Sequence, residues 1–263
     1  MYMVAHRGNL RESGNVRMEY MSASLRLVSV NVERSVHLEK VLIFLSKEKP
    51  DIVCVQELCE PDIPAFEKAL GAACFFAPMK HNARDGPLTT EGVGIFSRLK
   101  VRSRTTEWYV GAPGEVPIWD WTSLEKIQTS EHRVLLTVQV EKNGTVFQIA
   151  TTHFSWSPNG TVTDFQRGVL KRLLPLLEAK KEIVFCGDLN APRGGEIFDE
   201  LAKKYTDNIP ARYVSSLDGK LHRAGHLDWM VDCLFSTPKY NVTDVALTSG
   251  VSDHCAVTAT IAA

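Results

Sequence analysis

Short apolar runs alternate with amphipathic stretches and turns along most of this chain. Runs with the apolar or alternating pattern of β-strands cover residues 25–32, 51–55, 74–77, 92–98, 133–141, 146–152, 183–186, 229–235, 242–248 and 256–261. Apolar positions at helical spacing predict helices over residues 37–49, 61–70, 164–179 and 196–204. Strands and helices intermingle, and hairpins lie among the helical crossovers. The pattern therefore predicts an α/β protein with mixed sheets.

Two stretches have no clear pattern. Residues 80–91 contain several residues that break regular structure, and we predict a loop there. Residues 99–132 are aromatic, with Trp119 and Trp121 among Gly and Pro, and they predict a weak strand followed by an irregular insertion. That insertion is either a substrate-binding loop or a satellite of the core.

The two ends of the chain differ in pattern. Residues 1–22 are polar and lack periodicity, so we expect a flexible N-terminal tail; Met18 and Met21 are alternative starts. Residues 23–263 contain no convincing linker and predict a single domain. No apolar run approaches the ~20 residues that a membrane span needs, so no membrane span is expected.

Composition indicates an ordinary soluble protein. Hydrophobic residues make up 44% and charged residues 23%, with a net charge of −1, so no global basic field indicates permanent nucleic-acid binding. A transient contact of an enzyme with nucleic acid is compatible with this charge. The six cysteines form no CxxC pair and predict buried thiols in a reducing compartment, the cytoplasm.

Candidate chemistry begins at the run of residues 183–192, in which an apolar strand changes abruptly into turn residues. Residues i and i+2 of an extended segment lie on the same side, so Asp188 and Asn190 can point into one pocket. The alternative is that both residues only cap a strand-to-helix turn.

Other predicted strands also end in polar residues, and these residues favour a functional role for Asp188 and Asn190 over a role as turn caps. They are Asn31, Gln56-Glu57, His153 and Asp253-His254. In sheets with helical crossovers, the carboxyl ends of strands converge on one edge, where ligands bind. Carboxylate and amide oxygens suit Mg²⁺, whereas a zinc site would need more nitrogen or sulfur. The histidines fit acid–base work or hydrogen bonding to an oxyanion.

The motifs VSVNVE, VCVQEL, TTHF, VFCGDLN and VSDHCAV occur in this order over residues 25–261. This ordered set resembles the endonuclease/exonuclease/phosphatase superfamily of metal-dependent phosphodiesterases. The resemblance implies a four-layered sandwich of two mixed β-sheets flanked by helices, with the active site at one end.

The resemblance also assigns roles to the motif residues. Asn31 and Glu57 match the metal-binding positions, and Asp253 matches a possible further ligand. His153 matches the histidine that contacts the scissile phosphate.

On the other side of the implied site, Asp188 and Asn190 match the pair that handles the attacking water and the phosphate. His254 matches a second catalytic histidine, polarised by an acidic partner. Two residues compete for that partner role, and we prefer Asp232 to Asp228 because its surrounding strand matches the family pattern better.

The implied activity is Mg²⁺-dependent hydrolysis of phosphate esters, with Mn²⁺ able to substitute. We expect a phosphodiesterase of the nuclease-like branch, with a phosphodiester substrate and transient contact with nucleic acid. The alternatives are a phospholipid or inositol-phosphate phosphoesterase and a non-catalytic interaction module. The chain departs from the abasic-site endonucleases, because no residue matches their catalytic tyrosine and Tyr109 is a poor candidate.

Three further residues near the motifs are ambiguous. Trp156 and Asn159 follow the TTHF motif, where they form a substrate-facing loop or, for the tryptophan, cover the core. Arg133 opens a strand and could reach the phosphate, but we expect a solvated arginine at a strand end.

Overall fold

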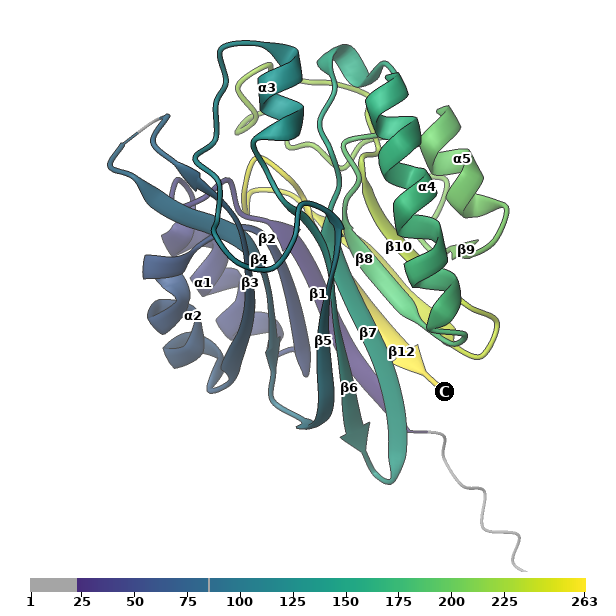
Figure 1. Ribbon diagram of the computed structural model, residues 1–263. Coiled ribbons are helices and arrows are strands. Elements are labelled where there is room, and N and C mark those ends of the chain that lie inside the picture. Colours follow the sequence, from purple (N-terminus) through teal and green to yellow (C-terminus); the bar gives the residue numbers. More distant parts are fainter. Residues whose placement is uncertain (1–22, 85) are drawn as a thin grey trace, which may run out of the picture.

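A computed structural model describes residues 23–84 and 86–263 of the chain. The predicted tail, residues 1–22, lies outside the described residues. Two six-stranded β-sheets pack face to face and helices cover their outer faces, as Figure 1 shows.

The first sheet holds both the N-terminal and the C-terminal strands. In spatial order its strands are β11 (Asn241–Thr248), β12 (Ala256–Ala262), β1 (Ser24–Asn31), β2 (Ile52–Cys59), β4 (Thr89–Ser97) and β3 (Ala73–Asn82). Strands β1 and β2 are parallel and the other neighbours antiparallel, so the sheet is mixed.

The second sheet comes from the middle of the chain. Its strands are, in spatial order, β5 (Lys100–Val110), β6 (Arg133–Lys142), β7 (Thr145–His153), β8 (Val184–Asp188), β10 (Asp232–Ser236) and β9 (Thr206–Asp207). It is mixed as well, because β7 and β8 are parallel whereas the remaining pairs are antiparallel.

The helices form the two outer layers. Helices α1 (Leu38–Glu48) and α2 (Ile63–Leu70) cover the first sheet, α4 (Asp164–Ala179) and α5 (Glu196–Ala202) cover the second, and α3 (Leu124–Thr129) lies at one end of the sandwich (Figure 1). Two short 3₁₀ turns, Glu60–Asp62 and Pro158–Gly160, join these elements. No helix in the described ranges is long and apolar enough to cross a membrane.

Alternate residues of the central strands enter different cores. Leu27 lies in the core between the two sheets, and Val28 packs in the core under α1 and α2. In the second sheet Val184 faces the first sheet, and Phe185 packs under α4 and α5. Because both faces are buried, these strands read as continuous apolar runs. The predicted four-layered sandwich is confirmed.

Two predicted boundaries are wrong. In the segment predicted as a loop at residues 80–91, residues 80–82 and 89–91 continue strands β3 and β4, which pair His81 with Thr90 although both are polar. The weak strand predicted within residues 99–132 is confirmed as the eleven-residue edge strand β5, whose polar residues face solvent. The strand predicted from residue 229 begins only at Asp232, because residues before it bond to loops instead of a neighbouring strand.

Candidate active site

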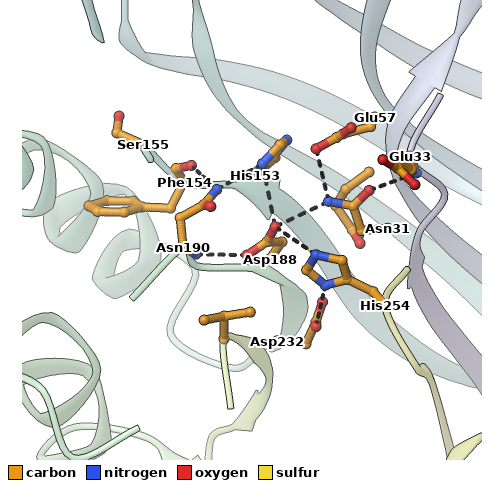
Figure 2. A network of polar contacts seen from close by, with 12 residues as sticks. Asn31, Glu33, Glu57, His153, Phe154, Ser155, Asp188, Asn190, Asp232 and His254 are labelled. Carbon is orange, nitrogen blue, oxygen red and sulfur yellow. Dashed lines mark hydrogen bonds and ion pairs between the residues drawn. The ribbon is translucent and has the colours of Figure 1, made fainter. Parts of the chain in front are cut away.

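One end of the sandwich collects the polar residues that terminate the predicted strands. Asn31, His153 and Asp188 are the last residues of β1, β7 and β8. Asp232 is the first residue of the antiparallel strand β10 and pairs with Asp188, which also pairs with His153. The sheet register therefore brings these side chains to one edge, where Figure 2 shows them pointing toward one another.

The glycine of the GDLN motif permits the close approach of β7 and β8. Gly187 has a φ of +139°, and a Cβ there would lie 2.0 Å from the carbonyl oxygen of Thr152. No residue with a side chain fits this position without moving the backbone. Gly187 thus sets the register that places Asp188 beside His153.

The side chains of Asp188 and Asn190 converge as predicted, but a turn and not an extended strand brings them together. The strand ends at Asp188, and Asn190 has a left-handed backbone with a φ of 48°. Its backbone N–H donates to Asp188 Oδ1 at 2.7 Å, which forms an Asx turn. The two side chains converge because of this turn, and not because of strand alternation.

Glu57 lies at a bulge inside β2 and not at the end of the strand. The register with β4 shifts between Val55 and Leu58, and Glu57 has a φ of 55°. A bulge re-aims a side chain. Here it turns the carboxylate toward Asn31, whose Nδ2 donates to Glu57 Oε1 at 3.1 Å and to Asp188 Oδ2 at 3.1 Å. Asn31 therefore joins the two sheets.

Of the two candidate partners of His254, the structure brings Asp232 into contact with the ring. The His254 Nδ1 to Asp232 Oδ2 distance is 2.7 Å, and His254 Nε2 lies 3.8 Å from Asp188 Oδ2. Burial alone would lower the pKa of His254, but the charges of Asp232 and Asp188 outweigh burial and raise it well above its ordinary value. Asp228 is exposed and pairs with His226 at 3.0 Å.

The pKa of His153 is shifted in the opposite direction from that of His254. The Nδ2 of Asn190 donates to the carbonyl oxygen of Phe154 at 3.0 Å, which fixes the orientation of the amide, and lies 2.9 Å from His153 Nε2. His153 Nε2 therefore accepts a hydrogen bond and the ring is neutral. Burial first, and then the charge of Arg133, lower the pKa of His153 well below its ordinary value.

The carboxylates at this edge are crowded. Burial, together with the charge of Glu91, raises the pKa of Glu57 to about 7. Burial is also the largest cause that raises the pKa of Asp188, to about 6. Asp253 is buried too; it accepts a hydrogen bond from Ser252 Oγ at 3.1 Å and adds to the negative potential at Glu57. Such a site favours a cation.

The donor set fits a hard cation that retains part of its water. Within the described residues, no group of three or more His, Cys, Asp or Glu side chains is close enough to hold a metal ion. The Glu57 carboxylate nevertheless offers oxygens, and the Asn31 amide lies beside it, with its Nδ2 toward Glu57 and its Oδ1 accepting from the backbone N–H of Glu33 at 3.0 Å. Mg²⁺ binds through one or two carboxylates and fills its other positions with water and substrate phosphate.

The sequence alone did not reveal a buried ion cluster next to Glu57. Lys80 Nζ lies 3.0 Å from Glu91 Oε1 and 3.1 Å from Glu131 Oε1. Lys80 and Glu91 were hidden in the predicted loop, although they belong to paired strands.

The prediction that Arg133 is solvated is wrong. The residue is 2% exposed, its Nη2 contacts Glu131 Oε2 at 2.8 Å, and its Nη1 donates to the carbonyl oxygen of His153 at 2.9 Å. Arg133 extends the ion cluster of Lys80, Glu91 and Glu131 to the backbone of His153.

A cleft with a volume of about 560 Å³ opens above these residues. Glu57, His153, Asp188 and His254 lie in its floor. Trp119, Trp121, Trp156 and Trp229 are among the residues that line it, together with His222 and Arg223. Tyr109 is absent from this lining; it is buried, and its hydroxyl contacts Thr152 Oγ1 at 2.6 Å.

Comparison with known proteins identifies the family. The model of the endonuclease/exonuclease/phosphatase family matches residues 15–254, so the chain belongs to this family. Members of the family are phosphoesterases, and the chain is accordingly a hydrolase that acts on phosphate ester bonds. None of the curated proteins matches the chain.

Solved structures share the fold at low sequence identity. An endonuclease/exonuclease/phosphatase protein from Beutenbergia cavernae superposes with a TM-score of 0.70 and 17% identity, over 91% of this chain and 71% of that one. A mannosyl-6-phosphatase from Bacteroides thetaiotaomicron has a TM-score of 0.65 and 13% identity, over 91% and 100%. TDP2 from D. rerio, complexed with a single-strand DNA product, has a TM-score of 0.62 and 18% identity, over 92% and 100%. At such identities the likeness shows the fold alone.

Proposed function

We propose that this protein is a Mg²⁺-dependent phosphodiesterase of the nuclease-like branch of its family, with Mn²⁺ as a substitute ion. Its substrate is a phosphodiester, with nucleic acid bound transiently. The six free cysteines, five of them buried, support the cytoplasm as its compartment. One observation carries the proposal: an acid–base pair, Asp188 and His254, lies beside the Glu57 carboxylate and the Asn31 amide that joins Glu57 to Asp188.

Glu57 and Asn31 would hold the ion, with Asp253 as a candidate for a further contact. Asn31 now presents its amide nitrogen to Glu57, so ion binding requires its oxygen to turn toward the carboxylate. When bound, the ion supplies positive charge to the phosphoryl oxygens and lowers the pKa of water.

Asp188 acts as the base in this proposal. A carboxylate with a pKa of about 6 is ionised at neutral pH and still accepts a proton from an attacking water. Both amide hydrogens of Asn190 are used by His153 and Phe154. The amide oxygen of Asn190 is therefore the group that can orient that water.

The two histidines have different tasks. His254 holds its Nδ1 proton against Asp232, so its Nε2–H is available to donate to a phosphoryl oxygen as charge develops there. His153 stays neutral and holds Asn190 in place through its Nε2. The fixed Asp232–His254 pair keeps the imidazolium oriented without reorganisation.

Metal removal and one substitution test this assignment. We expect chelation by EDTA to abolish turnover of bis(p-nitrophenyl) phosphate, and Mg²⁺ or Mn²⁺ to restore it. Glu57→Gln should lower turnover about hundredfold, because the ion supplies several kcal/mol of charge stabilisation. It should also weaken Mn²⁺ binding measured by calorimetry.

The exposed Glu39 of α1 provides a matched control, and Glu39→Gln should leave turnover and metal binding unchanged. Activity that survives chelation contradicts the role of the metal. Turnover of Glu57→Gln within a few-fold of wild type contradicts the site assignment.

A substrate panel separates the branches of the family. Single-stranded DNA, abasic duplex DNA, RNA, sphingomyelin, an inositol phosphate and p-nitrophenyl phosphate are incubated with Mg²⁺. The proposal expects hydrolysis of a nucleic acid. Turnover of only the lipid or the inositol phosphate would assign the protein to the second candidate, a phospholipid or inositol-phosphate phosphoesterase.

A further inference from the structure

Three tryptophans that line the cleft are together called the aromatic wall: Trp119, Trp121 and Trp156. Trp121 is 44% exposed and Trp156 is 43% exposed. Leaving such large apolar surfaces in water forfeits the stabilisation that burial would give. Exposed aromatic side chains gathered in a cleft beside catalytic residues therefore indicate a binding surface.

The wall is held in place by main-chain hydrogen bonds. The backbone N–H of Trp119 donates to the carbonyl oxygen of His81 at 2.8 Å, and that of His81 donates to Pro117 at 2.8 Å. The segment thus lies against the end of β3 as a short parallel bridge. Trp121 follows directly, and its ring meets that of Trp119 edge-on at a centroid distance of 6.1 Å.

Helix α3 links the two segments that carry the wall. Ser123 caps the helix by accepting from the N–H of Lys126 at 3.2 Å, and Ser130 Oγ accepts from the N–H of Asp120 at 2.8 Å. Gln128 Nε2 lies 3.4 Å from the carbonyl oxygen of Trp156. Because these hydrogen bonds hold the main chain that carries the rings, a flat group that stacks on them loses little free energy to ordering of the backbone.

The charges around the wall exclude one class of ligand. Lys80 Nζ lies 4.3 Å from the centroid of the Trp119 ring, and the guanidinium of Arg84 lies 5.9 Å from it. Tryptophans can also recognise quaternary ammonium groups. Because Lys80 and Arg84 already lie over the Trp119 ring, that ring is occupied, which disfavours a choline headgroup at it.

The inner part of the cleft disfavours a second class. Lys80 is paired with Glu91 and Glu131, and Arg133 with Glu131. With Glu57 beside them, the carboxylates here outnumber the cations. In this inner part of the cleft the charges of Lys80 and Arg133 are offset by carboxylates, so they do not favour a ligand that carries several phosphates, such as an inositol polyphosphate.

A neutral planar ring attached to one phosphodiester satisfies these constraints. The geometry points to the aromatic wall as the binding site for an unpaired nucleobase next to the scissile phosphate. This inference rests on the proposed function and names its substrate class. A base within a duplex has its faces covered by neighbouring bases, whereas a single strand can present a face to Trp121 or Trp156.

Binding without turnover tests the inference directly. A fluorescently labelled short oligothymidylate is titrated with protein in EDTA, and its anisotropy is followed. Trp121→Leu and Trp156→Leu should each weaken binding about 5-fold to 150-fold, the range for loss of one base–aromatic stack. Trp121→Phe keeps an aromatic ring and should weaken binding at most about twofold.

Two controls isolate the stacked base. An oligonucleotide with abasic sites throughout should bind the wild-type protein weakly. It should bind the Trp121→Leu variant with the same weak affinity, because it has no base to stack. The exposed Ile43 of α1 lies away from the cleft, and Ile43→Ala should leave oligothymidylate binding unchanged. Circular dichroism spectra that match wild type establish that the leucine variants fold.

The outcomes separate this inference from the proposed function. Oligothymidylate binding that neither leucine substitution weakens overturns the inference, even if the enzyme hydrolyses diesters. Competition by phosphocholine but not by thymidine monophosphate also overturns it. If binding depends on the wall but no nucleic acid is hydrolysed with Mg²⁺, the inference holds and the proposed function fails.

Discussion

The floor of the cleft and its aromatic wall are built in different ways. The floor residues Asn31, His153 and Asp188 end strands in the middle of the two sheets and are almost fully buried. The wall residues Trp121 and Trp156 are on segments outside the sheets and are partly exposed. The ladders of two sheets position the floor, whereas a few hydrogen bonds around α3 position the wall.

This difference assigns separate physical roles to the two regions. In the floor a change of charge acts in a buried, crowded network, so it alters the chemical step or the stability of the fold. On the wall a substitution removes contact area that is exposed to solvent. Changes there should alter which substrate binds and leave the floor intact.

The largest expected effect is at the centre of the floor. Asp188→Asn preserves the shape of the side chain but removes the proposed base, so kcat should fall about 10²-fold to 10⁴-fold. The measurement is steady-state hydrolysis of an aryl phosphodiester with Mg²⁺. Asp164→Asn at the exposed start of α4 is the control and should leave kcat unchanged. A variant of Asp188 within a few-fold of wild type would remove it from the mechanism.

The ion cluster beside the floor should affect stability. Lys80→Met leaves Glu91 without its cation and Glu131 with Arg133 alone in a buried site, so the free energy of unfolding should fall by about 3–5 kcal/mol. Urea denaturation measures this loss. The exposed pair of Arg102 and Glu141 gives the contrast, because Arg102→Met should change the unfolding free energy by only about 0–1 kcal/mol. Equal losses of unfolding free energy in the two variants would mean that the buried ion cluster contributes no more to stability than an exposed ion pair.

The next effect separates two neighbouring aspartates. Asp232→Asn removes the charge that contacts His254, which should lower the pKa of that histidine and lower turnover about 10-fold to 100-fold. Asp228→Asn changes an exposed side chain and should leave turnover within about twofold. Measured pH–rate profiles of both variants test this, and the reverse order of effects would exchange the two roles.

The smallest effect on activity is expected at Gln128, whose side chain contacts the backbone of the wall residue Trp156. Gln128→Ala removes long hydrogen bonds to the Trp156 backbone and to Thr163. It should raise KM for a single-stranded oligonucleotide about threefold, with kcat unchanged, because a weak hydrogen bond contributes about 0.5–1 kcal/mol. The conservative Gln128→Glu keeps one acceptor but loses both donors and should behave like the alanine variant. A fall in kcat instead would show that the wall is coupled to the floor.

Much of the fold was predictable because most strands are buried on both faces. The runs around Leu27, Val53 and Val184 are continuous and apolar for that reason, and they were identified as strands. Edge strands were harder. Strand β5 is polar along its exposed face, and β3 and β4 continue through polar pairs such as His81 and Thr90, so their pattern resembles that of a loop.

The members of the candidate site were predictable, but several of their relationships were not. Asp188 and Asn190 were expected to share a face of a strand, yet a left-handed turn brings them together. Glu57 was expected at a strand end, yet a bulge turns it inward. Arg133 was expected in solvent, because nothing near it in the chain reveals that Glu131 and the His153 carbonyl enclose it.

The sequence by itself determined the alternation of strands and helices, the two-faced burial of the central strands and the polar residues at their ends. These features depend on residues that are close together in the chain, so the local pattern of the sequence is enough to predict them. Only the tertiary structure decided that Asn31 bridges the two sheets, that Lys80 lies between Glu91 and Glu131, that Arg133 reaches the His153 carbonyl, and that Trp121 and Trp156 line one cleft. Each of these contacts joins segments far apart in the chain, so packing alone determines it.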